Sequence, residues 1–440
     1  MRLLLISQDF SPAVGGVQTY ADRMALAFSR RHEVTVLAPA ARGAAEHDAG
    51  LPYPVLRWPS GGAKARGPVT ARFPTGIGET RVAHRAGESA GSRRLPAAAS
   101  LLDGPVQNLL TSGFGAVVPL ALPLAAWRTG ARVAFHAQVA TAAAAMLAVR
   151  WRLLDRYYVA AHGREVLWAP LGAPQRAWRR AVFSGAAAVF AVSRFTAEAV
   201  RALGVPAERI AVVPNGVDRT RFRPVDPSEL RRRLGLAGRR VVLSAGRLVP
   251  RKGVDTLLEA FGVVHAVLAD AVLVIAGEGP DRERLEAMAV ARRVPVRFLG
   301  RVPDEELPAL YGMADVFALA AREEPGGDAE GFGLVLLEAA ACGTPCVASR
   351  SGGVPDAVDD GRSGLLVPPA DAGELATTLL RVLGDGPLRT RLAAGALARA
   401  ARSGWETTAA AILGRMEGEG EGKGGNHRWT QMNTDKGGGR

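Results

Sequence analysis

Cysteine, lysine and long uncharged runs are all scarce in this sequence of 440 residues. Its two cysteines, Cys342 and Cys346, exclude a disulfide framework and a four-cysteine zinc site. Because no histidine lies near them, we interpret both as small buried residues. Hydrophobic residues make up 48% and charged residues 22% of the chain, and the mean hydropathy is +0.08. This composition excludes a chain that is disordered throughout, collagen-like or mainly embedded in a membrane.

One stretch, residues 109–127, carries no charge and is long enough to cross a bilayer. It contains Gly113, Gly115, Pro119 and Pro123, which weaken a continuous helix. We therefore predict a buried helix, or a buried strand and turn, rather than a membrane span.

Lysine supplies only four of the 55 basic residues, and the formal net charge is +13. This preference for arginine, with many alanines and glycines, is as typical of GC-rich coding as of selection for polyanions. Basic charge favours anionic ligands such as sugar nucleotides, acidic lipid surfaces or nucleic acid. Because the sequence contains no RNA- or DNA-binding motif, we expect no nucleic-acid partner.

The length of 440 residues predicts at least two domains. Short apolar, β-branched runs alternate with longer helical patterns, which is typical of parallel sheets with crossover helices. The predicted strands are residues 3–7, 34–38, 55–58, 133–136, 157–161, 188–192, 210–213, 241–245, 272–276, 296–299, 316–319, 346–348 and 364–367. Turn residues at 214–218 and a linker-like stretch at 221–227 interrupt the series. We therefore predict an α/β fold of two doubly wound domains, residues 1–222 and 223–404, and a C-terminal segment, residues 405–440.

The first predicted strand runs into a loop that contains Gly15 and Gly16, and a helix opens after it. A glycine pair at a strand-to-helix turn lets the backbone approach an anion, whose charge the helix N-terminus favours. A tight turn that needs positive φ is the alternative. The loop lacks the G-x-G-x-x-G spacing of a dinucleotide site, which argues against a dehydrogenase.

The strand at 241–245 runs into a loop with two cations, Arg247 and Lys252. Such folds bind ligands at the carboxyl ends of their strands, and two cations suit a diphosphate whose charge grows as it leaves. Lys252 is the only lysine between Lys64 and Lys423. A compact, flexible ammonium is therefore favoured here over an ordinary surface charge.

Glu330 and Glu338 lie eight residues apart, separated by glycines and apolar residues. On one continuous helix they would lie about two turns apart and point about 80° away from each other. If only Glu338 is helical, Glu330 lies in the preceding loop and the free amides of the helix N-terminus lie between them. That arrangement can hold a sugar with one carboxylate, a phosphate with the amides and ribose hydroxyls with the other carboxylate.

Together these motifs resemble the retaining GT-B glycosyltransferases of family 4. The resemblance rests on Gly15-Gly16, Arg247 with Lys252, the E-x7-E pair Glu330 and Glu338, and the segments 215–218 and 352–355. It covers about residues 1–40 and 155–405, whereas 41–155 matches only in general pattern. Within the family, residues 16–20 and 326–330 look most like the phosphatidylinositol mannosyltransferases. The resemblance implies a GT-B fold, with a central cleft between an acceptor-binding first domain and a donor-binding second domain.

The resemblance also implies a role for each matching residue. The residues expected to be catalytic are His162, Glu330, Arg247 and Lys252. Those expected to bind the nucleotide-sugar donor are Gly15, Gly16, Arg247, Lys252, Val302, Glu330, Phe332, Gly333, Leu334, Val335 and Glu338. Among these, the sugar hydroxyls are assigned to Glu330, the ribose to Glu338 and the departing diphosphate to Arg247 and Lys252.

Two histidines end predicted strands. His162, within Ala-His-Gly-Arg-Glu, matches the family's histidine near the 6-hydroxyl of the sugar. His136 is the rival, and we interpret it as a core histidine.

Two segments match no motif. Residues 61–100 are rich in Gly, Ala and Arg, and we expect a mobile loop over the acceptor site or a tolerated disordered insertion. From Glu417 onward the chain is rich in Gly, Glu and Lys, and we expect a disordered tail.

The implied reaction is transfer of a hexosyl group, with retention, to a hydroxyl of a lipid or glycan acceptor in cell-envelope glycan synthesis. GDP-mannose is the favoured donor and UDP-hexoses follow. No Asp-x-Asp pair occurs, so we expect cationic side chains rather than a metal to hold the diphosphate, and no cofactor. A nucleotide-sugar 2-epimerase and a non-catalytic sugar-nucleotide-binding module are the alternatives.

The first apolar run, residues 3–6, is followed at once by Asp9, which predicts a buried strand rather than a signal peptide. We therefore expect a cytoplasmic protein. The basic first domain favours peripheral contact with an anionic membrane at its inner face.

Overall fold

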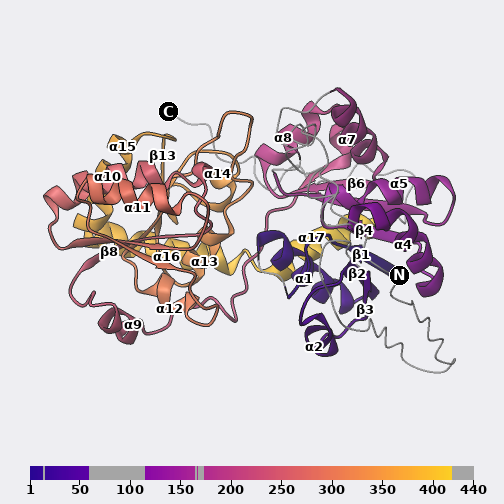
Figure 1. The fold of residues 1–440 in the computed structure, drawn as a ribbon, viewed down its shortest axis with the longest axis horizontal. Coiled ribbons are helices and arrows are strands. Elements are labelled where there is room, and N and C mark those ends of the chain that lie inside the picture. Colours follow the sequence, from indigo (N-terminus) through magenta and orange to yellow (C-terminus); the bar gives the residue numbers. More distant parts are fainter. Residues whose placement is uncertain (13–14, 59–113, 164–165, 167–172, 419–440) are drawn as a thin grey trace, which may run out of the picture.

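The computed structural model describes residues 1–12, 15–58, 114–163, 166 and 173–418. These residues form two α/β domains that lie side by side (Figure 1). The segment 61–100 and the tail beyond residue 418 lie outside the described residues, so the expectations for them stay predictions.

The first domain is built on a seven-stranded parallel sheet in the order β3-β2-β1-β4-β5-β6-β7. Its strands are β1 (Arg2–Ile6), β2 (Glu33–Pro39), β3 (Val55–Trp58), β4 (Val133–His136), β5 (Arg156–Ala161), β6 (Ala188–Ala191) and β7 (Ile210–Val212). Its helices are α1 (Gly16–Ser29), α2 (Ala44–Ala49), α4 (Phe114–Thr129), α5 (Ala143–Arg150), α7 (Ala173–Gly185) and α8 (Arg194–Ala202), with 3-10 turns η2 (Val139–Thr141) and η3 (Ala207–Arg209).

The second domain is built on a six-stranded parallel sheet in the order β10-β9-β8-β11-β12-β13. Its strands are β8 (Arg240–Ala245), β9 (Ala271–Ala276), β10 (Val296–Gly300), β11 (Val316–Leu319), β12 (Cys346–Ser349) and β13 (Gly364–Val367). Its helices are α9 (Ser228–Arg233), α10 (Val254–Val267), α11 (Arg282–Ala291), α12 (Leu307–Gly312), α13 (Leu334–Ala341), α14 (Val354–Ala357), α15 (Ala372–Gly384) and α16 (Gly386–Ala401), with a 3-10 turn η4 (Pro250–Lys252).

Each sheet is buried on both faces, which explains why its strands are apolar without alternation. In β1, Leu4 and Ile6 pack into the core on one side of the sheet, and Leu3 and Leu5 pack into the core on the other. The predicted fold of two doubly wound parallel-sheet domains is confirmed, and every predicted strand is present with its ends shifted by at most one residue.

The chain crosses between the domains twice. The first crossing lies between Val213, in the core of the first domain, and Phe222, in the core of the second. The second lies beside it, where the backbone N–H of Val217 donates to the carbonyl of Ser403 at 2.7 Å.

After the second crossing, helix α17 (Trp405–Gly418) returns to the first domain and packs against α1 (Figure 1). Trp405, Ile412 and Met416 lie in the same core cluster as residues of β1 and α1. Residues 405–418 are therefore an ordered part of the first domain, and the tail expected from Glu417 onward cannot begin before residue 419.

The uncharged stretch at 109–127 contributes to α4, which contains Pro119 and Pro123. Val118, Ala121 and Leu122 are buried, but Leu120 and Trp127 are 72% and 79% exposed. The expectation of a buried segment is therefore wrong for one face of this helix. No helix in the described parts of the chain is long and apolar enough to cross a bilayer.

Candidate active site

Both sheets reverse their strand order at one point, between β1 and β4 in the first and between β8 and β11 in the second. Doubly wound folds bind ligands beyond the carboxyl ends of the strands at this point, because the two adjoining loops diverge there. Gly15 and Gly16 follow β1, Lys252 follows β8, and Glu330 follows β11. The topology therefore explains why motifs far apart in the sequence can serve one site.

Lys252 and Glu330 form an ion pair in which Nζ lies 2.7 Å from Oε2. The two side chains are 11% and 13% exposed, so little water screens their attraction. Arg251 adds a second cation, with Nε 4.0 Å from the same oxygen. Burial raises the pKa of Glu330, but the Lys252 ammonium and the Arg251 guanidinium outweigh burial and hold this pKa below its ordinary value. Glu330 is therefore a carboxylate at neutral pH and can accept hydrogen bonds from hydroxyl groups.

Glu330 lies in a loop and only Glu338 is helical, because α13 begins at Leu334. Gly333 precedes this helix with φ 94°, a left-handed conformation that glycine adopts without strain. The first amides of α13, those of Leu334 and Val335, have no acceptor within the helix. The structure thus has the second of the two arrangements that the spacing allowed, with free amides between the two carboxylates.

The two domains touch beside this loop. A Cβ added to Gly331 would lie 1.8 Å from the backbone oxygen of His162, so only glycine allows this approach. Arg194 donates to Asp356 from its backbone N–H at 2.8 Å and from Nε at 2.6 Å. The first domain therefore presents the end of β5 directly to the glutamate loop of the second.

The glycine loop of the first domain also faces α13. A Cβ added to Gly16 would lie 3.5 Å from Cδ1 of Leu334. Gly15 has φ 167°, which is extended backbone, and Gly16 has no left-handed φ. A tight turn with positive φ therefore does not explain why Gly15 and Gly16 are glycines. Close approach of the backbone to another group is the remaining alternative.

The two histidines lie in different environments. His162 follows β5, its Nε2 donates to the carbonyl of Ala137 at 2.9 Å, and the Tyr20 ring packs edge-on with centroids 4.5 Å apart. His136 is fully buried, with Nδ1 2.8 Å from Oγ1 of Thr141. Burial lowers the pKa of His136 to about 3, so its ring is neutral. His136 is a core histidine, whereas His162 lies at the contact between the domains.

Comparisons with known proteins agree with this geometry. Two family models match the chain, Glycosyltransferase Family 4 over residues 92–221 and Glycosyl transferases group 1 over residues 226–399. The GDP-mannose-dependent alpha-(1-6)-phosphatidylinositol monomannoside mannosyltransferase of Mycolicibacterium smegmatis is 36% identical over 391 residues, which cover 87% of this chain and 89% of that protein. The chain is a family 4 glycosyltransferase.

Two further proteins agree with this assignment. The GDP-mannose-dependent monoacylated alpha-(1-6)-phosphatidylinositol monomannoside mannosyltransferase of Corynebacterium glutamicum is 31% identical over 428 residues, covering 95% of this chain and 98% of that protein. The crystal structure of Anabaena Alr3699/HepE in complex with UDP and glucose matches with a TM-score of 0.70 at 20% identity, covering 95% of this chain and 100% of that chain. The resemblance, the GT-B fold and the assignment as a hexosyltransferase are thus confirmed.

Within the described part of the chain, three other residues predicted for the donor site form no ion pair or side-chain hydrogen bond with Lys252 or Glu330. Arg247 follows β8 and is exposed, and within the described residues it forms no ion pair or hydrogen bond. Val302 follows β10 and packs, partly buried, on the core of the second domain. Phe332 is 3% exposed, so it can offer a ligand only its backbone. The roles of these residues stay predictions.

Two residues of the site were missed. Arg251 lies between Glu330 and Asp328, with Nη1 3.6 Å from Oδ2 of Asp328. The sequence feature that could have identified it is its position next to Lys252. Tyr311 donates to Glu338 from a helix 27 residues away, and no sequence pattern links the two.

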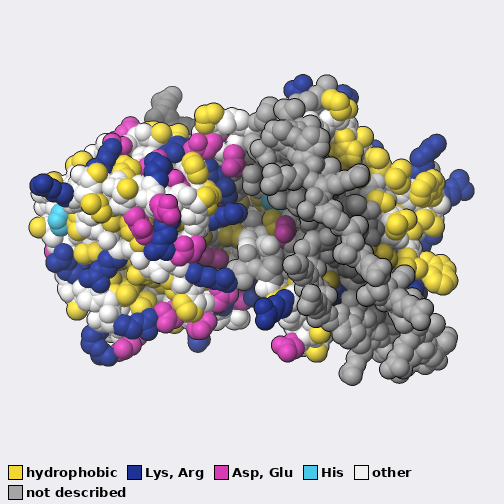
Figure 2. Space-filling model, viewed as in Figure 1, with side chains coloured by type: hydrophobic (Ala, Val, Ile, Leu, Met, Phe, Trp, Pro, Cys, Tyr) yellow, Lys and Arg dark blue, Asp and Glu magenta, His cyan; other side chains and the backbone are white. Residues whose placement is uncertain are grey.

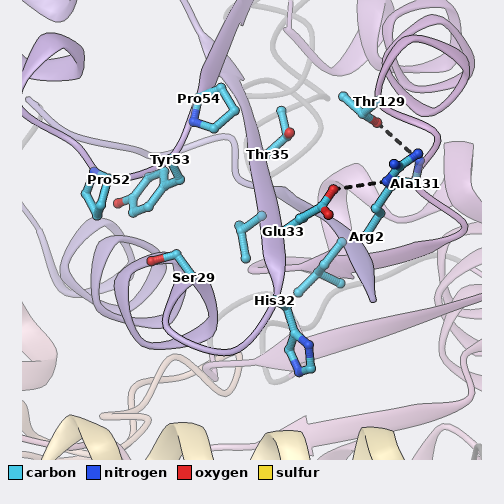
Figure 3. A pocket seen from close by; sticks show the side chains of 12 residues that line it. Arg2, Ser29, His32, Glu33, Thr35, Pro52, Tyr53, Pro54, Thr129 and Ala131 are labelled. Carbon is cyan, nitrogen blue, oxygen red and sulfur yellow. Dashed lines mark hydrogen bonds and ion pairs between the residues drawn. The ribbon is translucent and has the colours of Figure 1, made fainter.

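A cavity of about 420 Å³ lies at the amino ends of the strands of the first sheet (Figure 3). It is lined by the amino ends of β1 and β2, where Arg2 pairs with Glu33 at 3.0 Å. In a doubly wound glycosyltransferase domain the ligand lies at the carboxyl ends of the strands. This cavity is therefore not the donor site, in spite of its size.

Proposed function

We propose that this glycosyltransferase moves a mannosyl group from GDP-mannose to a lipid-linked phosphatidylinositol mannoside. The names of its curated relatives support this proposal, since both of those described above use GDP-mannose and act on phosphatidylinositol monomannosides. The structural observation that carries it is the buried Lys252–Glu330 pair beside the amides of α13, opposite His162.

The diphosphate, the sugar and the ribose of the donor each have a suitable group in this site. The first amides of α13 and the loop of Gly16 suit a phosphate, because a helix N-terminus favours negative charge. Lys252, with Arg247 on the same loop, supplies positive charge for the diphosphate. Glu330 accepts hydrogen bonds from the sugar hydroxyls, and Glu338 accepts them from the ribose.

In the transfer step, the bond between the anomeric carbon and the phosphate oxygen breaks, and its electron pair leaves with GDP. The acceptor oxygen forms a bond on the same face of the anomeric carbon, and its proton passes to the departing phosphate. Lys252 stabilises the charge that develops on that phosphate. Because Lys252 also lies 2.7 Å from Glu330, one ammonium links the group that binds the sugar to the group that receives the charge.

The test is a transfer assay with purified protein, phosphatidylinositol monomannoside in vesicles, and either radiolabelled GDP-mannose or radiolabelled UDP-glucose. We expect label in the lipid fraction only from GDP-mannose. Label only from UDP-glucose would support the alternative of a UDP-sugar transferase. Release of a free epimerised sugar without acceptor would instead indicate a 2-epimerase, and both results contradict the proposal.

We also propose that the first domain contacts the membrane through the exposed face of α4 and α5. Leu120 and Trp127 on α4 are 72% and 79% exposed, and Trp151 at the end of α5 is 63% exposed. These helices pack on one another, and Arg132 Nη1 donates to the carbonyl of Arg152 at 3.1 Å, which ties their ends together.

This face combines two properties that an acidic bilayer attracts. Figure 2 shows hydrophobic and basic side chains together at the end of the first domain farthest from the second, where α4 and α5 lie in Figure 1. Exposed tryptophans favour the membrane interface, and each nearby arginine contributes about 1 kcal/mol at an anionic surface. A lipid-linked acceptor explains why the enzyme would have such a face.

Co-sedimentation with vesicles tests the membrane contact. We expect the wild-type chain to bind vesicles that contain acidic phospholipid, and Trp127→Ser with Trp151→Ser to weaken binding at least about tenfold. Val290→Ser is the control, because Val290 is also 79% exposed but lies on α11 of the second domain. Equal binding by wild type and the tryptophan variant would refute the proposal that the exposed face of α4 and α5 contacts the membrane.

A further inference from the structure

One hydrogen bond joins Glu338 to a buried tyrosine that approaches it from the protein interior. Tyr311, on α12, is 1% exposed, and its hydroxyl donates to Oε2 of Glu338 at 2.6 Å. A bond of this length to a carboxylate is a strong, charge-assisted hydrogen bond. Among the described residues, Tyr311 is the side-chain donor to Glu338.

Tyr311 is held firmly in place. Its ring packs against Phe222 and Phe317, with centroids 5.9 and 5.7 Å apart. Its backbone oxygen accepts a hydrogen bond from Oγ1 of Thr344 at 2.7 Å. Burial also holds the pKa of the Tyr311 hydroxyl well above its ordinary value, so the group stays protonated and remains a donor.

We propose that Tyr311 is a positioning residue, which holds one carboxylate oxygen of Glu338 so that the other is left facing the ribose hydroxyls of the donor. This rests on the proposed function in one respect, the binding of ribose by Glu338. A carboxylate with two free oxygens can rotate, whereas a hydrogen bond from a buried hydroxyl to one oxygen restricts that rotation. Because ribose is common to GDP, UDP and ADP, the role of Tyr311 does not depend on the base.

The charge state of Glu338 gives a second reason. Burial raises the pKa of Glu338, the Tyr311 hydrogen bond and the charges of Arg221 and Lys252 lower it, and Asp304 raises it. The result is a pKa above the ordinary value for glutamate, and the loss of the Tyr311 hydroxyl would raise it further. A protonated Glu338 would accept fewer hydrogen bonds from ribose.

The test compares ligands that differ only in the ribose hydroxyls. Calorimetry would measure binding of GDP and of 2′,3′-dideoxy-GDP to the wild type and to Tyr311→Phe, which keeps the ring and its packing. We expect the dissociation constant for GDP to rise about tenfold and that for dideoxy-GDP to change less than about twofold. Tyr157→Phe is the matched control, because Tyr157 is also buried and its hydroxyl donates at 2.6 Å to Val182, in the other domain.

Two further readouts separate positioning from general loosening of the fold. In a Glu338→Ala background, Tyr311→Phe should have no further effect on GDP binding, because the Glu338 carboxylate through which Tyr311 acts is absent. In transfer assays, Tyr311→Phe should raise KM for the donor with little change in kcat, and should move the acidic limb of the kcat/KM profile to higher pH.

Equal weakening of GDP and dideoxy-GDP would overturn the proposal, because it would mean that Tyr311 supports the domain and not the ribose contact. Unchanged GDP binding in Tyr311→Phe would overturn it as well. A wild-type chain that binds neither GDP nor UDP would overturn the proposed function itself, and this outcome is distinct from both.

Discussion

We expect the contact between Gly331 and His162 to make the approach of the two domains sensitive to a single methyl group. A Cβ at position 331 would lie 1.8 Å from the backbone oxygen of His162, whereas real contacts of this kind are not shorter than 3.0 Å. Gly331→Ala must therefore displace the backbone at this contact by about 1.2 Å, and a misplacement of about 1 Å can cost about 100-fold in rate. That factor corresponds to about 2.7 kcal/mol of lost transition-state stabilisation.

Steady-state transfer kinetics and nucleotide titration would measure the two sides of this effect. We expect kcat for Gly331→Ala to fall about 100-fold, while the affinity for GDP stays within about threefold, because Lys252, Glu338 and the first amides of α13, which we propose to bind the nucleotide, all lie in the second domain. Gly414→Ala on α17 is the control, since a Cβ there has no neighbour within 4 Å. A kcat for Gly331→Ala equal to that of the control would refute the idea that the reaction needs this close approach of the domains.

Three further predictions concern charged and buried groups. Lys252→Ala removes the nearer of the two cations that face the buried Glu330 carboxylate, so we expect about 3 kcal/mol lower unfolding free energy in denaturant titrations and weaker GDP binding. Glu330→Gln should reduce transfer by about 100-fold or more while GDP binding survives, since the amide cannot replace the carboxylate at the sugar; full activity would exclude the assigned role. His136 has a pKa of about 3 when folded and 6.5 when unfolded. Between pH 3 and pH 6.5 the unfolded chain therefore binds more protons, and the unfolding free energy should fall as the pH drops through this range. The slope should reach about 1.4 kcal/mol per pH unit and flatten in His136→Phe, and an unchanged slope would contradict the assignment.

The strands were predictable from sequence, because strands buried on both faces read as short apolar runs with turn residues between them. For the secondary structure around Glu330 and Glu338, the sequence allowed two alternatives. Their spacing fits a continuous helix as well as a loop and a helix, and the left-handed backbone at Gly333 decides between them.

Contacts between segments distant in the chain could not be read from any local pattern. Helix α17 belongs to the first domain because Trp405 and Met416 complete its core, yet the preceding residues belong to the second. The Tyr311–Glu338 hydrogen bond and the exposed face at Trp127 likewise depend on which helices pack together. Apolar composition predicted burial for Trp127, whereas its side chain is 79% exposed in the structure.

The central claim, that a nucleotide sugar binds at the Lys252–Glu330 pair, is tested most directly by thermal unfolding with GDP, UDP and ADP in wild type and Lys252→Ala. A ligand at about 100 times its dissociation constant stabilises the folded state by about 2.7 kcal/mol. We predict that GDP raises the midpoint of the wild-type chain more than UDP or ADP does, and that Lys252→Ala loses most of this shift. A wild-type chain that none of the three nucleotides stabilises, or a GDP shift that Lys252→Ala keeps in full, would contradict the account.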